Sequence, residues 1–177
     1  MKSSKVKKIV LTGLFTALLI VLQYITKPMG QLVTGTCVNF VLIAAAMLAG
    51  LVPSIVVAVI SPFFAYAFGI GPQLLPVVPA IAAGNLVLCL IYSLVFSKLG
   101  YNKVLSWIIS IIFGAAVKFG VIYLLAVKTI IPMLGLPAQK ATAMGAAFGI
   151  TQMFTALLGG AAAFIIIPLI KKGIEQQ

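Results

Sequence analysis

Residues 9–22 read IVLTGLFTALLIVL and contain no charged side chain. A second stretch near the other end of the chain, residues 164–170, reads FIIIPLI and is equally apolar. In both stretches the apolar positions are continuous, whereas a strand of a transmembrane barrel alternates apolar and polar positions. These stretches therefore predict membrane-spanning α-helices.

The composition of the whole chain predicts the same class of protein. Of its 177 residues, 63% are hydrophobic and only 7% are charged, whereas a soluble domain carries about 25% charged residues. At roughly 20 residues for each spanning helix plus short loops, the length allows about six spans. We therefore expect an all-α integral membrane protein, a bundle of six transmembrane helices in a single domain over residues 1–177. The expected spans are residues 9–26, 36–50, 54–68, 75–96, 104–131 and 142–170.

The lysines predict the orientation of this bundle. With the N-terminus inside the cell, eight lysines fall in cytoplasmic segments and three in outer segments. The first group is Lys2, Lys5, Lys7, Lys8, Lys98, Lys103, Lys171 and Lys172, and the second is Lys27, Lys128 and Lys140. An excess of lysine in short cytoplasmic loops is what the positive-inside rule describes. Both termini are thus expected in the cytoplasm, in a multi-pass protein of the plasma membrane.

Several classes of function are excluded by residues that the chain lacks. The net charge of +11 comes from lysines at chain ends and helix boundaries rather than on one face, which argues against a nucleic-acid partner. There is no histidine, and the only acidic residue is Glu175. Carboxylate pairs, Ser-His-Asp groups and the usual metal sites are therefore absent, as is a GxxxxGK[ST] loop for ATP phosphates. We expect no enzyme, no metal and no cofactor in this chain.

One lysine lies deep within a predicted span. Lys118 comes 14 residues after the start of the fifth helix at Val104, about 21 Å along its axis. This depth is past the midplane of a ~30 Å hydrocarbon core, where a charged side chain costs about 2.5–3.5 kcal/mol. Its helix row contains Ser106, Ser110 and Gly114, which suits the bundle interior. Lys118 is either a cation that faces a ligand or a structural lysine bonded to neighbouring carbonyls.

Polar side chains on two other helices reach a similar depth. Asn85 and Gln152 each lie about ten residues, or roughly 15 Å, inward from the outer ends of the fourth and sixth helices. Together with Lys118 they predict a pocket that opens to the outside. Four more side chains are expected around it, namely Asn39 on the second helix, Gln31 and Gln73 in outer loops, and Tyr123 as an apolar wall. For each amide alone, hydrogen bonding between helices is the alternative explanation.

The charge of this pocket restricts its ligand. No carboxylate lies within a predicted span, so a bound cation would face Lys118 without a counter-ion at low dielectric. The pocket should therefore prefer an anionic or neutral solute. The segment 69–79 covers the outer end of the third and fourth helices, is rich in glycine and proline, and carries no charge. We expect it to pack down over the bundle as a lid.

The first helix carries a small-xxx-small pattern, Gly13-Leu-Phe-Thr-Ala17. Such a pattern lets another helix approach closely, either a helix of the same bundle or one of a partner protein.

With these features the chain resembles the substrate-binding S component of an energy-coupling factor (ECF) vitamin transporter. In that family the pattern on the first helix is typically Ala-xxx-Ala and faces the coupling protein; here Gly13 replaces the first alanine. The resemblance implies a pocket at Asn85, Lys118 and Gln152, with residues 34–36 in the lid region. It also implies a location in the bacterial plasma membrane. The implied partners are a transmembrane coupling subunit and two cytosolic ATPase subunits, which would bind the ATP.

The sequence leaves the solute and some alternatives open. Pantothenate is the preferred vitamin, and folate, niacin and biotin also suit a lysine, as does the uncharged hydroxymethylpyrimidine; thiamine is disfavoured by its charge. A self-sufficient carrier or channel is the main alternative, and it would show ATP-independent flux in liposomes. A membrane enzyme would need a catalytic group that the sequence does not show. A structural subunit would bind no small molecule.

Overall fold

The computed structural model describes residues 2–71, 73–101 and 103–175, and all the regular structure in these ranges is helical. The long helices are α1 (Lys2–Thr26), α2 (Gln31–Ala44), α3 (Leu51–Ala67), α4 (Val78–Leu99), α5 (Val104–Ile122), α7 (Ala138–Phe148) and α8 (Ile150–Glu175). Shorter helical segments join or extend them: 3₁₀ turns at Lys27–Met29 and Leu75–Val77, π-helical segments at Ala45–Ala49 and Tyr123–Ile130, and α6 (Ile131–Met133). The predicted all-α class is confirmed.

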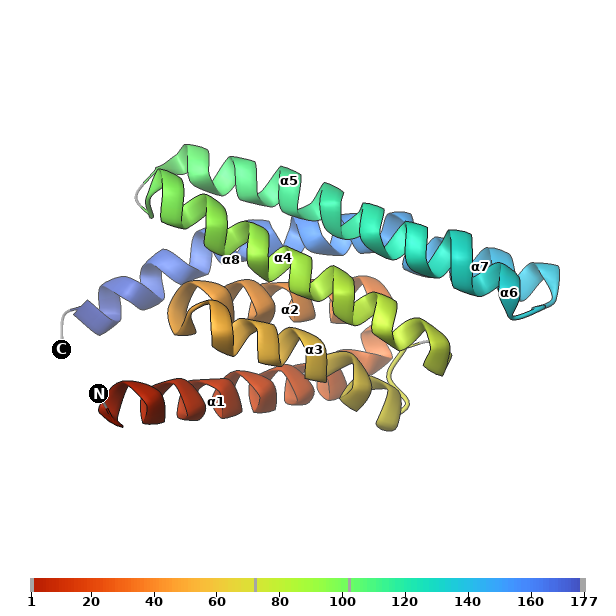
Figure 1. The fold of residues 1–177 in the computed structure, drawn as a ribbon, viewed down its shortest axis with the longest axis horizontal. Helices are drawn as coiled ribbons and strands as arrows, with labels where there is room; N and C mark the ends of the chain where they lie inside the picture. Colours follow the sequence, from red (N-terminus) through yellow and green to blue (C-terminus); the bar gives the residue numbers. More distant parts are fainter. Residues whose placement is uncertain (1, 72, 102, 176–177) are drawn as a thin grey trace.

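The long helices other than α7 pack side by side in a closed ring. In order around the ring, α1 packs against α2, α2 against α8, α8 against α5, α5 against α4, α4 against α3, and α3 against α1 (Figure 1). The start of α1 and the end of α8 lie at the same end of this bundle, called the terminus end below (Figure 1). The connections that follow α1, α3 and α5 lie at the opposite end.

Within the described residues, five helical segments are long and apolar enough to cross a membrane: Lys5–Met29, Gln31–Ala49, Leu75–Leu99, Val104–Met133 and Ala138–Gly173. The remaining long helix, α3, is apolar but has only 17 residues. Its length of about 25 Å is at the lower limit for crossing a ~30 Å core. Large apolar side chains on the outside of the bundle are exposed, including Ile9 and Leu169, as expected where lipid is the solvent.

Four helices start earlier than the sequence predicted: α1 at Lys2, α2 at Gln31, α3 at Leu51 and the last span at Ala138. The second begins at Gln31 rather than at residue 36, directly after Gly30, whose φ of +85° ends the preceding turn. Its first turn contains Gln31 and Thr34, which are polar but bond within the bundle: Thr34 Oγ1 donates to the Thr26 carbonyl at 2.9 Å. The last predicted span begins at Ala138 rather than at residue 142. In α2, polar side chains that form hydrogen bonds inside the protein therefore resembled a loop in the sequence.

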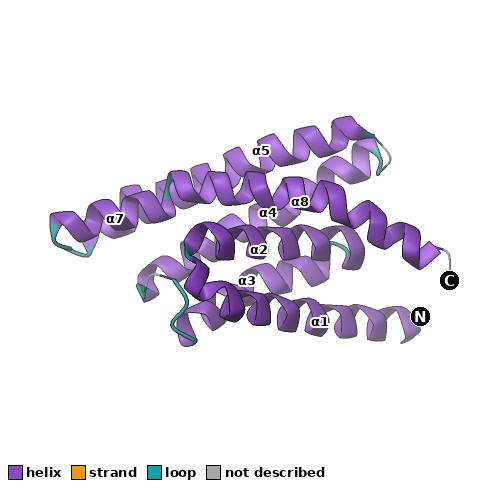
Figure 2. Cartoon of the chain, turned by 180° about the vertical axis from the view of Figure 1, so that it is seen from behind, coloured by secondary structure: helices purple, strands orange, loops and turns teal. Residues whose placement is uncertain are grey.

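The last span is also interrupted. Gly149 separates α7 from α8 with a non-helical φ of −97° and ψ of −116°, and Figure 2 shows this break as a short loop between the two helices. A Cβ at Gly149 would lie 2.5 Å from the carbonyl oxygen of Gly145, so only glycine fits the break. Irregular backbone at membrane depth is tolerated where it lines a cavity rather than lipid.

Glycines bring α2 and α8 into close contact. A Cβ at Gly159 on α8 would lie 2.6 Å from the Cβ of Asn39 and 2.9 Å from the backbone nitrogen of Phe40. One helical turn away, a Cβ at Gly35 on α2 would lie 2.7 Å from Cγ2 of Thr155. Each helix thus offers a glycine to a side chain of the other, which is how small residues shorten the distance between membrane helices.

We predict that Gly159→Ala lowers the stability of the protein by about 1–3 kcal/mol, because the added methyl group overpacks the contact between α2 and α8. The matched control is Gly120→Ala on α5, where a Cβ would meet nothing within 4 Å. This control should be neutral or stabilising by up to about 1 kcal/mol, since alanine favours helix over glycine. Thermal unfolding in detergent, followed by circular dichroism, measures both; equal midpoints would contradict the prediction.

Candidate binding cavity

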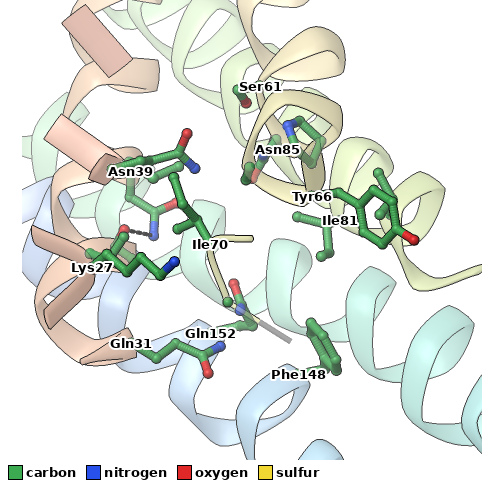
Figure 3. A pocket seen from close by; sticks show the side chains of 18 of the residues that line it. Lys27, Gln31, Asn39, Ser61, Tyr66, Ile70, Ile81, Asn85, Phe148 and Gln152 are labelled. Carbon is green, nitrogen blue, oxygen red and sulfur yellow. Dashed lines mark hydrogen bonds between the residues drawn. The ribbon is translucent and has the colours of Figure 1, made fainter. Parts of the chain in front are cut away.

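A cavity of about 170 Å³ lies inside the bundle toward the end opposite the termini. The helices α1 to α5 contribute to its wall, together with Phe148 at the end of α7 and Gln152 on α8. In Figure 3, Asn39, Ser61 and Asn85 lie on one side of this cavity, and Gln31 and Gln152 lie on the other. The first three belong to middle parts of their helices, so they form the floor, whereas Gln31 begins α2 and lies at the mouth.

The ammonium group of Lys118 is held at the floor by two amide oxygens. Lys118 Nζ donates to Oδ1 of Asn39 at 2.5 Å and to Oδ1 of Asn85 at 2.7 Å. All three side chains are at most 2% exposed, although they come from three helices, α5, α2 and α4. An ammonium group carries three donors, and within the described residues no third acceptor bonds to this one. One donor of this ammonium group therefore has no acceptor among the described residues, and Lys118 lines the cavity.

The orientation of Asn39 is fixed by bonds on its other side. Its Nδ2 donates to the carbonyl of Gly35 at 2.9 Å and to Oγ1 of Thr155 at 3.2 Å. Thr155 Oγ1 in turn donates to the carbonyl of Gln152 at 3.1 Å. Because its nitrogen is bound to α2 and α8, the amide must turn its oxygen toward Lys118. The close contact between α2 and α8 thus orients the Asn39 oxygen that accepts from the ammonium group.

At the mouth, a backbone carbonyl near the break between α7 and α8 accepts hydrogen bonds from two side chains. The oxygen of Ala147 accepts from Nε2 of Gln31 at 2.9 Å and from Nε2 of Gln152 at 3.3 Å. Ala147 is among the last four residues of α7, whose carbonyls lack partners within their own helix. The break in the last span therefore supplies an acceptor that links α2 to α8 beside the cavity.

The electrostatic character of the cavity is positive. Lys118 lies at the floor and Lys27, which is exposed, lines the mouth. No acidic side chain occurs among the described residues that line the cavity, and the single acidic residue of the sequence, Glu175, belongs to the far end of α8. A ligand with a negative or neutral group at the floor is the one that these charges favour.

A protein-family model covers nearly the whole chain. The model of the family described as ECF transporter, substrate-specific component, matches residues 7–171. The chain belongs to this family. No curated protein and no solved structure matches it. It is therefore a substrate-specific membrane subunit of an ECF transporter, with a small-molecule substrate and ECF partners, and the resemblance seen in the sequence is confirmed.

In this S component, four of the side chains singled out from the sequence line the cavity: Lys118, Asn85, Asn39 and Gln152. Gln31, expected in an outer loop, lines it from the first turn of α2. Of the segment 34–36, assigned to the lid region, Thr34 and Gly35 line the cavity, but they do so from within α2.

Two expected residues do not line the cavity. Gln73 is exposed, and its Nε2 donates to the carbonyl of Gly71 at 3.4 Å within the same connection. Tyr123 stacks on Phe119 with a centroid separation of 5.4 Å, and the ammonium of Lys128 lies over its ring. Tyr123 follows Lys118 by five residues, which is about 140° around a helix, so the two side chains point in different directions.

The structure adds side chains that sequence reasoning missed. Gln23 on α1 and Ser61 on α3 line the cavity and are buried, and Ile70 in the connection after α3 covers it with only 8% of its surface exposed. The burial of Ile70 agrees with the expectation that the segment 69–79 packs down, although Pro72 in that segment lies outside the described residues. The available signal was Gln23 itself, an amide within an otherwise apolar part of the first helix.

We predict that Thr155→Val destabilises the protein by roughly 0.6–1.5 kcal/mol, the value of one or two hydrogen bonds inside a membrane protein. The substitution keeps the shape of the side chain but removes the acceptor for Asn39 and the donor to Gln152. Thr142→Val is the matched control, because Thr142 is exposed and bonds only to the Ala138 carbonyl; its effect should stay within about 0.5 kcal/mol. Reversible unfolding in mixed micelles measures the difference. Equal effects of the two substitutions would show that the network does not hold Asn39.

Proposed function

We propose that this S component captures an anionic or neutral water-soluble micronutrient from outside the cell and holds it in the cavity at Lys118. The observation that carries the proposal is the buried ammonium group, bonded to Asn39 and Asn85 with one donor left over. A carboxylate on the solute would accept that donor in a charge-assisted bond. It would also neutralise a charge that is costly inside a membrane.

The lysines support an orientation with both termini in the cytoplasm. Apart from the buried Lys118, the lysines whose side chains are described form two groups: Lys5, Lys7, Lys8, Lys98, Lys103, Lys171 and Lys172 belong to the terminus end, and Lys27, Lys128 and Lys140 to the opposite end. The side chain of Lys2 lies outside the described part. By the positive-inside rule the terminus end faces the cytoplasm. All six ring helices, α3 included, then cross the bacterial plasma membrane, and the cavity opens to the outside.

The energy for transport comes from partners in this proposal. A transmembrane coupling subunit binds the S component, and two cytosolic ATPase subunits bind and hydrolyse the ATP. The contact with the coupling subunit is placed at Gly13 and Ala17 on α1, because both are exposed and a Cβ at Gly13 would meet nothing within 4 Å. The alternative use of this small-xxx-small pattern, packing inside the same bundle, finds no support at Gly13.

Among the vitamins that suit a lysine, pantothenate stays the preferred candidate because its carboxylate can pair with Lys118. The size of the cavity adds a constraint. At about 170 Å³, it is close to the ~150 Å³ that holds one benzene molecule in another protein. The enclosed part thus favours compact solutes, and folate becomes the least suited of the candidates.

Native mass spectrometry of the full chain purified from rich medium tests the proposal. We expect a small acidic or neutral solute to co-purify, and its mass identifies it. ATP-independent flux by the chain alone in liposomes would instead support a self-sufficient carrier or channel.

We predict that Lys118→Met leaves the protein folded but weakens binding of the co-purified solute by about 2 kcal/mol or more, roughly thirtyfold. Methionine has a similar length, and the loss of two hydrogen bonds is offset by no longer burying a charge. Lys140→Met, at an exposed position on α7, is the control for the same substitution and should not change affinity. Isothermal titration measures both. Unchanged affinity in Lys118→Met would show that the lysine is structural.

We also predict that Gly13→Leu and Ala17→Leu each reduce co-purification with the coupling subunit at least tenfold while solute affinity stays the same. A leucine would prevent the close approach of another helix. Ala116→Leu, at an exposed position on α5, is the control for a bulky side chain elsewhere on the outer surface. If Ala116→Leu also lost assembly, the effect would not be specific to α1, and this would contradict the placement of the contact there.

A further inference from the structure

Two polar atoms at the cavity have no hydrogen-bond partner within the described residues: Oε1 of Gln23 and Oγ of Ser61. Both residues line the cavity, and they are only 6% and 1% exposed. Neither one takes part in the network around Lys118. They come from α1 and α3, whereas Lys118 and its two amide partners come from α5, α2 and α4. The cavity therefore has two further polar groups, Ser61 at the floor and Gln23 on α1, that do not bond to Lys118.

Unpartnered polar groups of this kind are rare because they are costly. Most buried polar atoms of native proteins have a partner, and leaving one without a partner costs about 1–3 kcal/mol. Three other buried hydroxyls without a partner, on Tyr92, Ser93 and Ser110, do not line the cavity. Gln23 and Ser61 differ from these because their side chains line the cavity. A small rotation of either side chain toward the cavity would let a bound molecule supply the missing partner.

The chemistry of these two atoms specifies that group. The amide oxygen of Gln23 only accepts hydrogen bonds, and the hydroxyl of Ser61 accepts or donates. A hydroxyl or a neutral N–H of a solute can satisfy either atom. An ammonium group is disfavoured, because no carboxylate occurs among the described lining residues and Lys118 already carries a positive charge there.

We propose that Gln23 and Ser61 form a second subsite that binds a hydroxyl or neutral N–H donor of the substrate, while Lys118 binds its acidic group. The substrate class is thus a compact acid that also carries a hydroxyl or an amide. This inference rests on the proposed function and narrows it. It also gives α1 and α3 a direct part in recognising the solute.

The test uses three variants of the full-length chain. Ser61→Ala removes only a hydroxyl, and Gln23→Leu removes the amide at similar size. Ser110→Ala is the matched control, since its hydroxyl is also buried and unpartnered but lies away from the cavity. The probe is the solute that co-purifies with the wild-type protein, identified by mass and fragmentation and titrated back onto stripped protein. Thermal midpoints confirm that each variant is folded.

We expect Ser61→Ala and Gln23→Leu each to raise the dissociation constant roughly tenfold, the effect of one lost hydrogen bond, and Ser110→Ala to change it less than twofold. The co-purified solute should contain both an acidic group and a hydroxyl or N–H donor.

Each of the other outcomes shows whether the second subsite or the proposed function is wrong. If Lys118→Met loses binding but Ser61→Ala and Gln23→Leu do not, the second subsite is wrong and the proposed function stands. A solute without a donor group overturns the inference in the same way. A wild-type chain that binds no solute contradicts the proposed function, and the inference falls with it.

Discussion

The structure depends on one requirement: an ammonium group inside a membrane must be solvated by protein oxygens. Lys118 meets this with two amide oxygens from two other helices. Neither amide can rotate freely, because its oxygen must point toward the ammonium group. The amide of Asn39 is held on its other side as well, by the bonds of its nitrogen to Gly35 and Thr155. The positions of α2, α4 and α5 around the cavity are therefore linked through a single charge.

The close contact between α2 and α8 serves the same requirement. The glycines at positions 35 and 159 remove the side chains that would separate the helices, so Thr155 can bond to Asn39 and fix its orientation. The break at Gly149 works in parallel at the mouth, where the Ala147 carbonyl accepts from two glutamines. Packing and polar chemistry are thus not separate parts of this bundle. Small residues determine which polar groups meet.

The sequence correctly predicted the features that depend on the position of a residue along its helix axis. Hydropathy located the helices, and counting residues placed Lys118, Asn85 and Gln152 at one depth, where the structure has them around one cavity. The path of a loop depends on contacts with other elements, so Gln73 was misplaced relative to the cavity. Tyr123 was misplaced although its rotation of about 140° from Lys118 can be counted in the sequence. Ser61 was missed because a serine in an apolar helix looks ordinary until its missing partner is seen in three dimensions.

The positive charge of the cavity floor is concentrated in a single side chain, surrounded by neutral amides and hydroxyls. The two amide oxygens that face it, on Asn39 and Asn85, accept hydrogen bonds and therefore suit a donor only. Because the Asn39 amide is fixed by bonds to α2 and α8, reversing the charge at position 118 would leave its oxygen facing an acceptor. A related bundle that binds a cation would therefore need matching changes on α2 as well as on α5, so that its selectivity could not change without its packing.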